Sequence, residues 1–199
     1  KENIKIDRLE KKDIISALIS PNRNYLDSSL LGFVWGRIYS KRILKNVLFD
    51  ENIHFKEDML FNLDAYSNSD RIIIIPDKCY NYILNENSAS FKFYPTYDLE
   101  INYFYNILKM KEKNQLIDNN DLYIWGIYMY MNYLKHNALH KKSKGNYLKN
   151  IRNTFENKMW CEIFNNVDSI KLDKKSRLLQ KLFKKRFSIA IYIMYKLNE

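Results

Sequence analysis

The sequence predicts an α/β region followed by a mainly α-helical region, with the change near Pro95. Residues 71–76 are an arginine, four isoleucines and a proline, and β-branched residues favour a strand that the proline then ends. After Pro95 the apolar residues recur with the spacing of amphipathic helices. The chain has only 4 glycines and 3 prolines, which favours long helices with few tight turns. We therefore expect two domains, residues 1–95 and residues 96–199.

The elements of the first region follow from the same periodicity. The apolar side chains of Met59, Leu60, Leu63 and Tyr66 share one face of an expected helix. The expected elements are a helix over residues 4–19, a loop over 21–24, a buried strand or turn over 30–39 leading to a short helix over 40–45, a helix over 57–67, strands over 71–76 and 79–84, and a polar loop over 86–95.

The second region is expected to be built around residues 122–134, which are apolar on nearly every face and predict a central core helix. No apolar run approaches the ~18 residues that a membrane span requires, so none is expected. His136 and His140 are one helical turn apart, but two lysines follow and a third ligand is missing. We therefore expect a solvated helix end there and no metal site. The expected helices cover residues 97–114, 120–139, 144–164 and 174–197.

The excess of positive charge lies entirely in the last part of the chain. Residues 1–140 carry 18 Lys and Arg against 18 Asp and Glu, whereas residues 141–199 carry 15 against 5, which gives the net charge of +10. Residues 174–186 interleave Leu and Phe with Lys and Arg at helical spacing, and an apolar stretch follows. This pattern favours contact of residues 174–197 with an anionic membrane surface. An ordinary helix packed on the domain is the main alternative.

An acidic pair, Glu57 and Asp58, opens the helix expected over residues 57–67. Carboxylates in a first turn suit the positive end of the helix dipole, so helix capping alone would explain them. A carboxylate at a helix start that faces a cleft is also well placed to remove a proton from an attacking hydroxyl. The pair is therefore the candidate catalytic feature of the chain.

Three blocks in order resemble the second half of the catalytic domain of bacterial family-two glycosyltransferases, which are inverting enzymes of the GT-A type. The blocks are residues 34–39, which are aromatic-rich, residues 49–61, which contain the acidic pair, and residues 80–90, which are rich in Tyr and Ser. The resemblance runs from about residue 9 to residue 95. It implies that the α/β region is the acceptor half of a nucleotide-sugar transferase fold.

The resemblance also implies roles for individual residues. Asp58 would be the general base that activates the acceptor, and Glu57 would bind the acceptor or orient the site. Ser88 and Ser90 could hydrogen-bond the donor, but the family often has a diphosphate-binding arginine where this chain has Ile83. The acceptor side of the cleft would be formed by Trp35, Arg37, Tyr39 and Tyr82.

The family binds its nucleotide-sugar donor with an N-terminal half that ends in an Asp-x-Asp, which holds a divalent cation, Mg²⁺ or Mn²⁺, on the diphosphate. This sequence contains no Asp-x-Asp and no glycine-rich phosphate loop. The resemblance thus implies sugar transfer to a saccharide or lipid-linked acceptor in polysaccharide biosynthesis. It also implies a cation in the complete enzyme and little or no activity in this chain alone.

Two alternatives to an enzyme remain open. One is a non-enzymatic membrane- or partner-docking module whose acidic pair is vestigial. The other is RNA binding through the basic, tyrosine-rich second region, but nucleic acid is not expected because no nucleic-acid motif is recognisable. Since no signal peptide is apparent, we expect a cytoplasmic protein, peripheral at the inner face of the membrane if residues 174–197 bind lipid.

Overall fold

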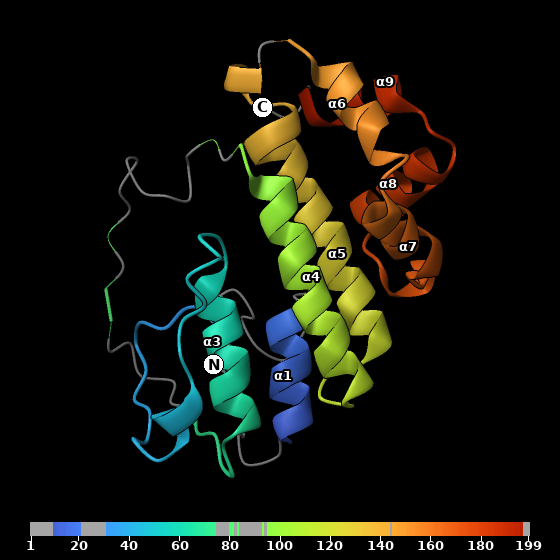
Figure 1. The fold of residues 1–199 in the computed structure, drawn as a ribbon. Coiled ribbons are helices and arrows are strands. Elements are labelled where there is room, and N and C mark those ends of the chain that lie inside the picture. Colours follow the sequence, from blue (N-terminus) through green and yellow to red (C-terminus); the bar gives the residue numbers. More distant parts are fainter. Residues whose placement is uncertain are drawn as a thin grey trace.

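The computed structural model describes residues 10–20, 31–74, 80–81, 83, 93, 95–143 and 145–196. These residues form helices joined by turns (Figure 1). The α-helices are α1 (Lys11–Ile19), α3 (Glu57–Ser67), α4 (Tyr97–Lys113), α5 (Asn119–Tyr133), α6 (Tyr147–Thr154), α7 (Lys158–Asn166), α8 (Lys174–Lys184) and α9 (Ser188–Lys196). The shorter elements are 3-10 helices at Ile43–Asn46, Lys141–Ser143 and Ser169–Lys171, and a π-helical segment, Leu134–Ala138, that continues α5.

Helix α5 lies at the centre of the fold, as its apolar sequence predicts. Figure 1 shows α4 and α5 side by side, with α1 and α3 on one side and α6–α9 on the other. Helix α5 contacts α1, α4, α7 and α8, so nearly all of its faces are covered. Leu122, Trp125 and Tyr130 are almost completely buried in these contacts. A helix that is apolar all round is stable only in such surroundings.

Aromatic rings join α5 to the last helices. The ring of Tyr130 meets those of Trp160, Phe164 and Phe183 edge-on, with centroid separations of 5.1, 4.9 and 5.4 Å. Phe164 and Phe183 stack at 3.8 Å. The Tyr130 hydroxyl is 2.9 Å from the hydroxyl of Thr154, so its polar end is hydrogen-bonded inside the core. Edge-on aromatic pairs add stabilisation beyond their buried area, and here they join α5 to α7 and α8.

Helix α1 joins the two predicted regions. It packs against α3 and α5, and the Ser16 hydroxyl donates a buried hydrogen bond to the Asp121 carboxylate of α5. Residues from both sides of Pro95 belong to one hydrophobic cluster. The division of the chain at residue 95 stays a prediction.

The predicted α/β character of the first region is wrong, because the described residues contain no strand. Residues 71–74, the start of the expected strand over 71–76, have no regular secondary structure, and Ile73 is 64% exposed. Half of the second expected strand, over 79–84, lies outside the described residues. A β-branched run favours a strand only where a neighbouring strand can pair with it, and the described part of the chain supplies none. The segment over 31–39 forms bends and turns.

The helix predictions fare better, although two of them merge pairs of helices. The expected helices over 57–67, 97–114 and 120–139 correspond to α3, to α4, and to α5 with its π-helical continuation. The expected helix over 144–164 is broken into α6 and α7, because Asn157 accepts a hydrogen bond from the backbone N–H of Trp160 and caps α7. The helix expected over 174–197 is broken into α8 and α9 at Arg186, whose φ is 56°.

Candidate functional site

The acidic pair lies where the sequence places it, in the first turn of α3. Lys56 precedes the helix with a φ of 66°, so the chain turns sharply before Glu57 and Asp58. Both side chains are half-buried. The positive end of the helix dipole favours carboxylates at this position. The pair is therefore held on a rigid element and is partly removed from solvent.

Asp58 is held against the preceding aromatic-rich segment. Its Oδ2 accepts a hydrogen bond of 3.4 Å from the backbone N–H of Val34. Burial raises the pKa of the Asp58 carboxyl, although the Val34 N–H and the positive charge of Arg37 oppose that shift. A carboxylate with a raised pKa holds a proton more readily, which is the property that a general base needs.

Glu57 has a similar environment with more negative charge around it. Burial raises the pKa of its carboxyl, a hydrogen bond from its own backbone N–H opposes the shift, and the charge of Asp58 adds to it. Glu100 of α4 also raises this pKa, whereas His54 lowers it. The Glu100 carboxylate is fixed by the backbone N–H of His54 at 2.9 Å and by the Thr96 hydroxyl at 3.0 Å. Glu100 was not predicted, and its spacing in the sequence carries no signal for this role.

Trp35 and Arg37 belong to the segment that the first sequence block covers, and the backbone N–H of Val34 in this segment binds Asp58. The half-buried indole of Trp35 is stacked between the rings of Phe33 and Tyr80, each at 4.9 Å. Gly36 has a φ of 67°, which a side chain would strain, so glycine allows the turn between Trp35 and Arg37. The Arg37 Nε donates to the carbonyl of Phe33, and its guanidinium lies 5.8 Å from the ring centroid of Tyr66.

Tyr39 and the buried residue Asn62 hold this segment on α3. The Tyr39 hydroxyl donates to Asn62 Oδ1 at 2.5 Å, and burial raises the pKa of Tyr39 to about 12, so its phenol stays protonated. The Asn62 amide donates to the carbonyls of Leu31 and Phe33, at 3.1 and 2.9 Å. Asn62 is fully buried. The sequence reasoning missed it, although a polar residue on the apolar side of a predicted helix was a usable signal.

Replacing Asn62 by alanine is expected to destabilise the fold by about 3 kcal/mol, because two backbone carbonyls and the Tyr39 hydroxyl lose a buried partner. Urea unfolding followed by circular dichroism measures this cost. Asn166→Ala is the control, because Asn166 is exposed and its amide donates to a carbonyl within its own helix. Equal stabilities of the two variants would show that Asn62 does not anchor the segment.

The raised pKa values also predict how stability depends on pH. A carboxyl whose pKa is higher in the folded state than in the unfolded state favours folding when protonated, and this benefit is lost as pH rises. Asp58→Asn is therefore expected to be more stable than the parent at pH 7, with the difference disappearing near pH 3, below the ordinary carboxyl range. Urea midpoints at the two pH values test this.

Asp50→Asn is a control that is expected to change stability at pH 7 in the opposite direction. Burial acts to raise the pKa of Asp50, but hydrogen bonds from Asn52 and from the Tyr103 hydroxyl, each 2.9 Å long, lower it overall. Its removal is expected to destabilise the protein at pH 7 and to have no such effect near pH 3. If Asp58→Asn also destabilises the protein at pH 7, the raised pKa of Asp58 is wrong.

The third sequence block falls mostly outside the described residues. Tyr82, Ser88 and Ser90 lie there, so their predicted contacts with acceptor and donor stay predictions. The described residues therefore bring together Glu57, Asp58 and the aromatic segment of residues 33–39.

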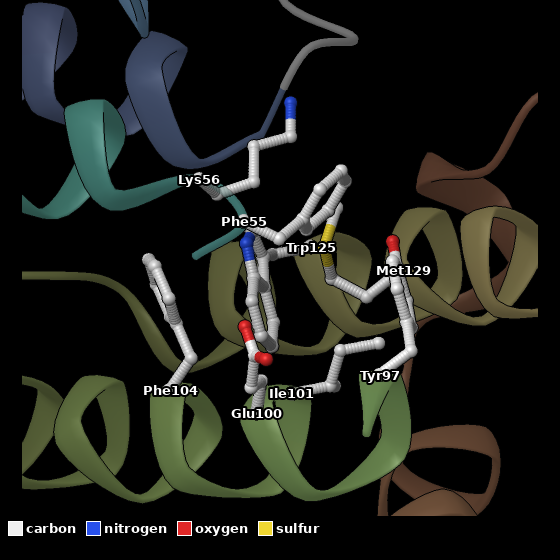
Figure 2. A pocket seen from close by; sticks show the side chains of 8 residues that line it. All are labelled: Phe55, Lys56, Tyr97, Glu100, Ile101, Phe104, Trp125 and Met129. Carbon is white, nitrogen blue, oxygen red and sulfur yellow. The ribbon is translucent and has the colours of Figure 1, made fainter. Parts of the chain in front are cut away.

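A small hollow lies between the turn that precedes α3 and the α4–α5 pair (Figure 2). Its volume is about 220 Å³ including its open mouth. The Lys56 ammonium lies 5.8 Å from the ring centroid of Phe55, one of the rings that line the hollow. The buried Trp125 indole N–H has no hydrogen-bond partner within the described part of the chain. The hollow is lined by Phe55, Lys56, Tyr97, Glu100, Ile101, Phe104, Trp125 and Met129.

His136 contributes to the same region, which corrects the expected solvated helix end. It is only 8% exposed, and its ring lies 6.1 Å from the ring of Tyr97 and 6.2 Å from that of Phe55. Among the described residues, no cluster of three or more His, Cys, Asp or Glu side chains is arranged to hold a metal ion. These residues therefore do not fit the divalent cation that the resemblance implies.

Comparison with known proteins gives one informative similarity. Over 66 residues the chain is 33% identical to the uncharacterized glycosyltransferase EpsJ of Bacillus subtilis (strain 168). The match covers 32% of this chain and 19% of EpsJ, so it spans about a fifth of the length of that relative. No protein-family model and no solved structure matches. Part of the chain is thus similar to a protein named as a glycosyltransferase.

Proposed function

We propose that this chain is the acceptor-side part of a glycosyltransferase and that Asp58 is its general base. The observation that carries the proposal is a half-buried carboxyl of raised pKa at the start of α3, which accepts a hydrogen bond from the Val34 N–H and interacts with the charge of Arg37. The partial similarity to a protein named as a glycosyltransferase supports the same reaction class. Burial of a carboxylate lowers the stability of the fold at neutral pH. If the acidic pair were vestigial, nothing would favour keeping the Asp58 carboxylate partly buried.

The proposed reaction is a single displacement at the anomeric carbon of a nucleotide-sugar. The acceptor hydroxyl loses its proton to the Asp58 carboxylate as its oxygen forms the new glycosidic bond. The bond from the anomeric carbon to the diphosphate oxygen breaks, and its electron pair leaves with the nucleoside diphosphate. A base with a raised pKa is better matched to this proton transfer near neutral pH. Direct displacement inverts the anomeric configuration.

Neighbouring residues would position the acceptor for this step. The Glu57 carboxylate can accept hydrogen bonds from other hydroxyls of the acceptor, and Arg37 can donate to sugar or phosphate oxygens. The stacked rings of Phe33, Trp35 and Tyr80 provide a flat apolar surface beside them. The acceptor would be a saccharide or a lipid-linked saccharide. Donor and cation binding would rest mainly on residues other than those described.

The test is release of nucleoside diphosphate from a panel of nucleotide-sugars with saccharide and lipid-linked acceptors. It is run on the 199-residue chain and on the polypeptide encoded by its complete reading frame. We expect acceptor-dependent release by the complete polypeptide and little by the chain alone. Absence of release from both, across the panel and with Mg²⁺ or Mn²⁺ present, would favour a docking module without transferase activity.

A further inference from the structure

The junction between α8 and α9 exposes positive charges and large apolar side chains together. We call residues 184–189 and Ile193 the basic–apolar corner. Lys184, Lys185 and Arg186 are all exposed, and they directly precede Phe187, which is 53% exposed. Ile189 is 57% exposed and Ile193 is 47% exposed. Large apolar side chains gathered at the surface indicate a site of interaction rather than packing.

The corner is held in a fixed shape by the way α8 ends. Arg186 adopts a left-handed conformation, its N–H donates to the carbonyl of Phe183 at 2.8 Å, and the N–H of Phe187 donates to the carbonyl of Leu182 at 3.0 Å. This pair of bonds is the Schellman motif, which usually has glycine at the left-handed position. Arg186 also forms a 2.5 Å ion pair with Glu156. Phe187 is therefore exposed by a defined turn rather than by fraying.

Helix α9 has one buried face and one exposed apolar face. Ser188 and Ile191 are buried, and Arg152 of α6 donates to the Ser188 hydroxyl at 3.3 Å. Ile189 and Ile193 are four residues apart, so they lie on one face of α9, and both are exposed. The fold covers one side of α9 and leaves an apolar pair on another.

Packing also corrects the expectation that residues 174–197 lie as one amphipathic helix on a membrane. The apolar side chains of Leu179, Phe183 and Ile191 are buried in the core and cannot enter a bilayer while the protein is folded. The outward side of α8 keeps its cations, because Lys174, Lys181, Lys184 and Lys185 are exposed. The basic–apolar corner combines such charges with three large exposed apolar side chains, Phe187, Ile189 and Ile193.

We propose that the basic–apolar corner docks the protein on the surface of an anionic phospholipid bilayer. The positive charge matches anionic headgroups, and Phe187, Ile189 and Ile193 gain by leaving water for the interface. The aliphatic parts of the lysine side chains can lie along these apolar groups while the ammonium groups stay among the headgroups. Nucleic acid would match the charge, but it would leave the aliphatic side chains in water. In the part of the chain that the structure describes, no helix is long and apolar enough to cross a membrane.

The experiment is co-sedimentation of the 199-residue chain with phosphatidylcholine vesicles, with and without about 30% phosphatidylglycerol. We expect binding to the anionic vesicles only, falling as NaCl rises from about 50 mM to about 500 mM. Lys184→Gln/Lys185→Gln is expected to lower the vesicle partition coefficient ~30-fold, because each lysine near an anionic surface contributes ~5-fold. Ile189→Ser/Ile193→Ser and Phe187→Ser/Ile189→Ser are expected to lower it at least ~10-fold.

Matched substitutions elsewhere serve as controls. Lys113→Gln/Lys135→Gln removes two exposed lysines from other helices, and Leu99→Ser/Met110→Ser removes two exposed apolar side chains from α4. Both control pairs are expected to bind vesicles like the parent, and far-UV circular dichroism shows which variants are folded.

Three outcomes would overturn the proposal. The first is absence of anionic vesicle binding by the folded parent. The second is equal loss of binding in the control pairs. The third is that the lysine double variant loses vesicle binding while both apolar double variants keep it fully, which would show a purely electrostatic contact. Competition between single-stranded RNA and the vesicles would then identify the preferred polyanion.

Discussion

Asp58→Asn is expected to lower the rate of sugar transfer by the complete polypeptide by about 10²–10⁴-fold. The amide has nearly the shape of the carboxyl and can still accept the hydrogen bond from the Val34 N–H, but it cannot take the proton of the acceptor hydroxyl. Substrate binding is expected to change much less, so the loss belongs to kcat rather than to KM. Initial rates of nucleoside diphosphate release at saturating acceptor measure the effect.

Asp70→Asn is the matched control for this prediction. Asp70 is exposed and pairs with Arg42 at 2.9 Å, and exposed ion pairs contribute little to stability. Its activity is expected to stay close to that of the parent. Full activity in Asp58→Asn would contradict the proposed base, whereas equal losses in both variants would indicate that folding rather than chemistry was affected. The stability of Asp58→Asn at pH 7 separates these results, because that variant is expected to be more stable than the parent.

Gly126→Val is expected to destabilise the protein by about 3 kcal/mol. A Cβ atom added at Gly126 would lie 2.7–2.8 Å from three side-chain carbons of Ile163, and real contacts of this kind essentially never occur. Helices α5 and α7 would have to separate, and Trp160 and Phe164 would move with α7. The free energy of unfolding in urea measures the cost.

A double substitution tests whether the contact with Ile163 causes this loss. Ile163→Ala alone is expected to cost about 2–4 kcal/mol, because it leaves a cavity in the core. Combined with Gly126→Val, it is expected to cost clearly less than the sum of the two single changes, since the valine fills the cavity. If the costs of the two substitutions simply add, the contact with Ile163 is not the cause of the loss in Gly126→Val. Gly145→Ala is a further control, because a Cβ atom added there would have no described neighbour within 4 Å and only the φ of 78° resists a side chain.

Prediction from sequence succeeded for α3 and α5, where one periodic pattern decides the structure. The buried positions Leu63 and Tyr66 follow the period of 3.6 residues, and residues 122–134 are apolar in all directions. It failed at the breaks between α6 and α7 and between α8 and α9. The signals there are an asparagine cap and a left-handed arginine, and neither interrupts the apolar pattern as glycine or proline would.

For the candidate site, too, prediction succeeded for local features and failed for long-range ones. Glu57 and Asp58 were predicted from their position and from the residues around them, because the first turn of a helix is a local property. Asn62 and Glu100 were not predicted, since their roles depend on which distant backbone groups and carboxylates come close to them. Similarly, the charge of residues 174–186 was evident, but which of their apolar neighbours stay exposed was not.

The sequence by itself determined that this protein is rich in helices, that an acidic pair opens one of them, and that its excess of positive charge lies in the last 59 residues. These are properties of composition and of residues a few positions apart. Only the tertiary structure decided that the isoleucine run has no strand partner among the described residues, that Asp58 is partly desolvated, and that Phe187 and Ile189 face outwards. Burial and pairing depend on segments far apart in the chain, so no local pattern records them.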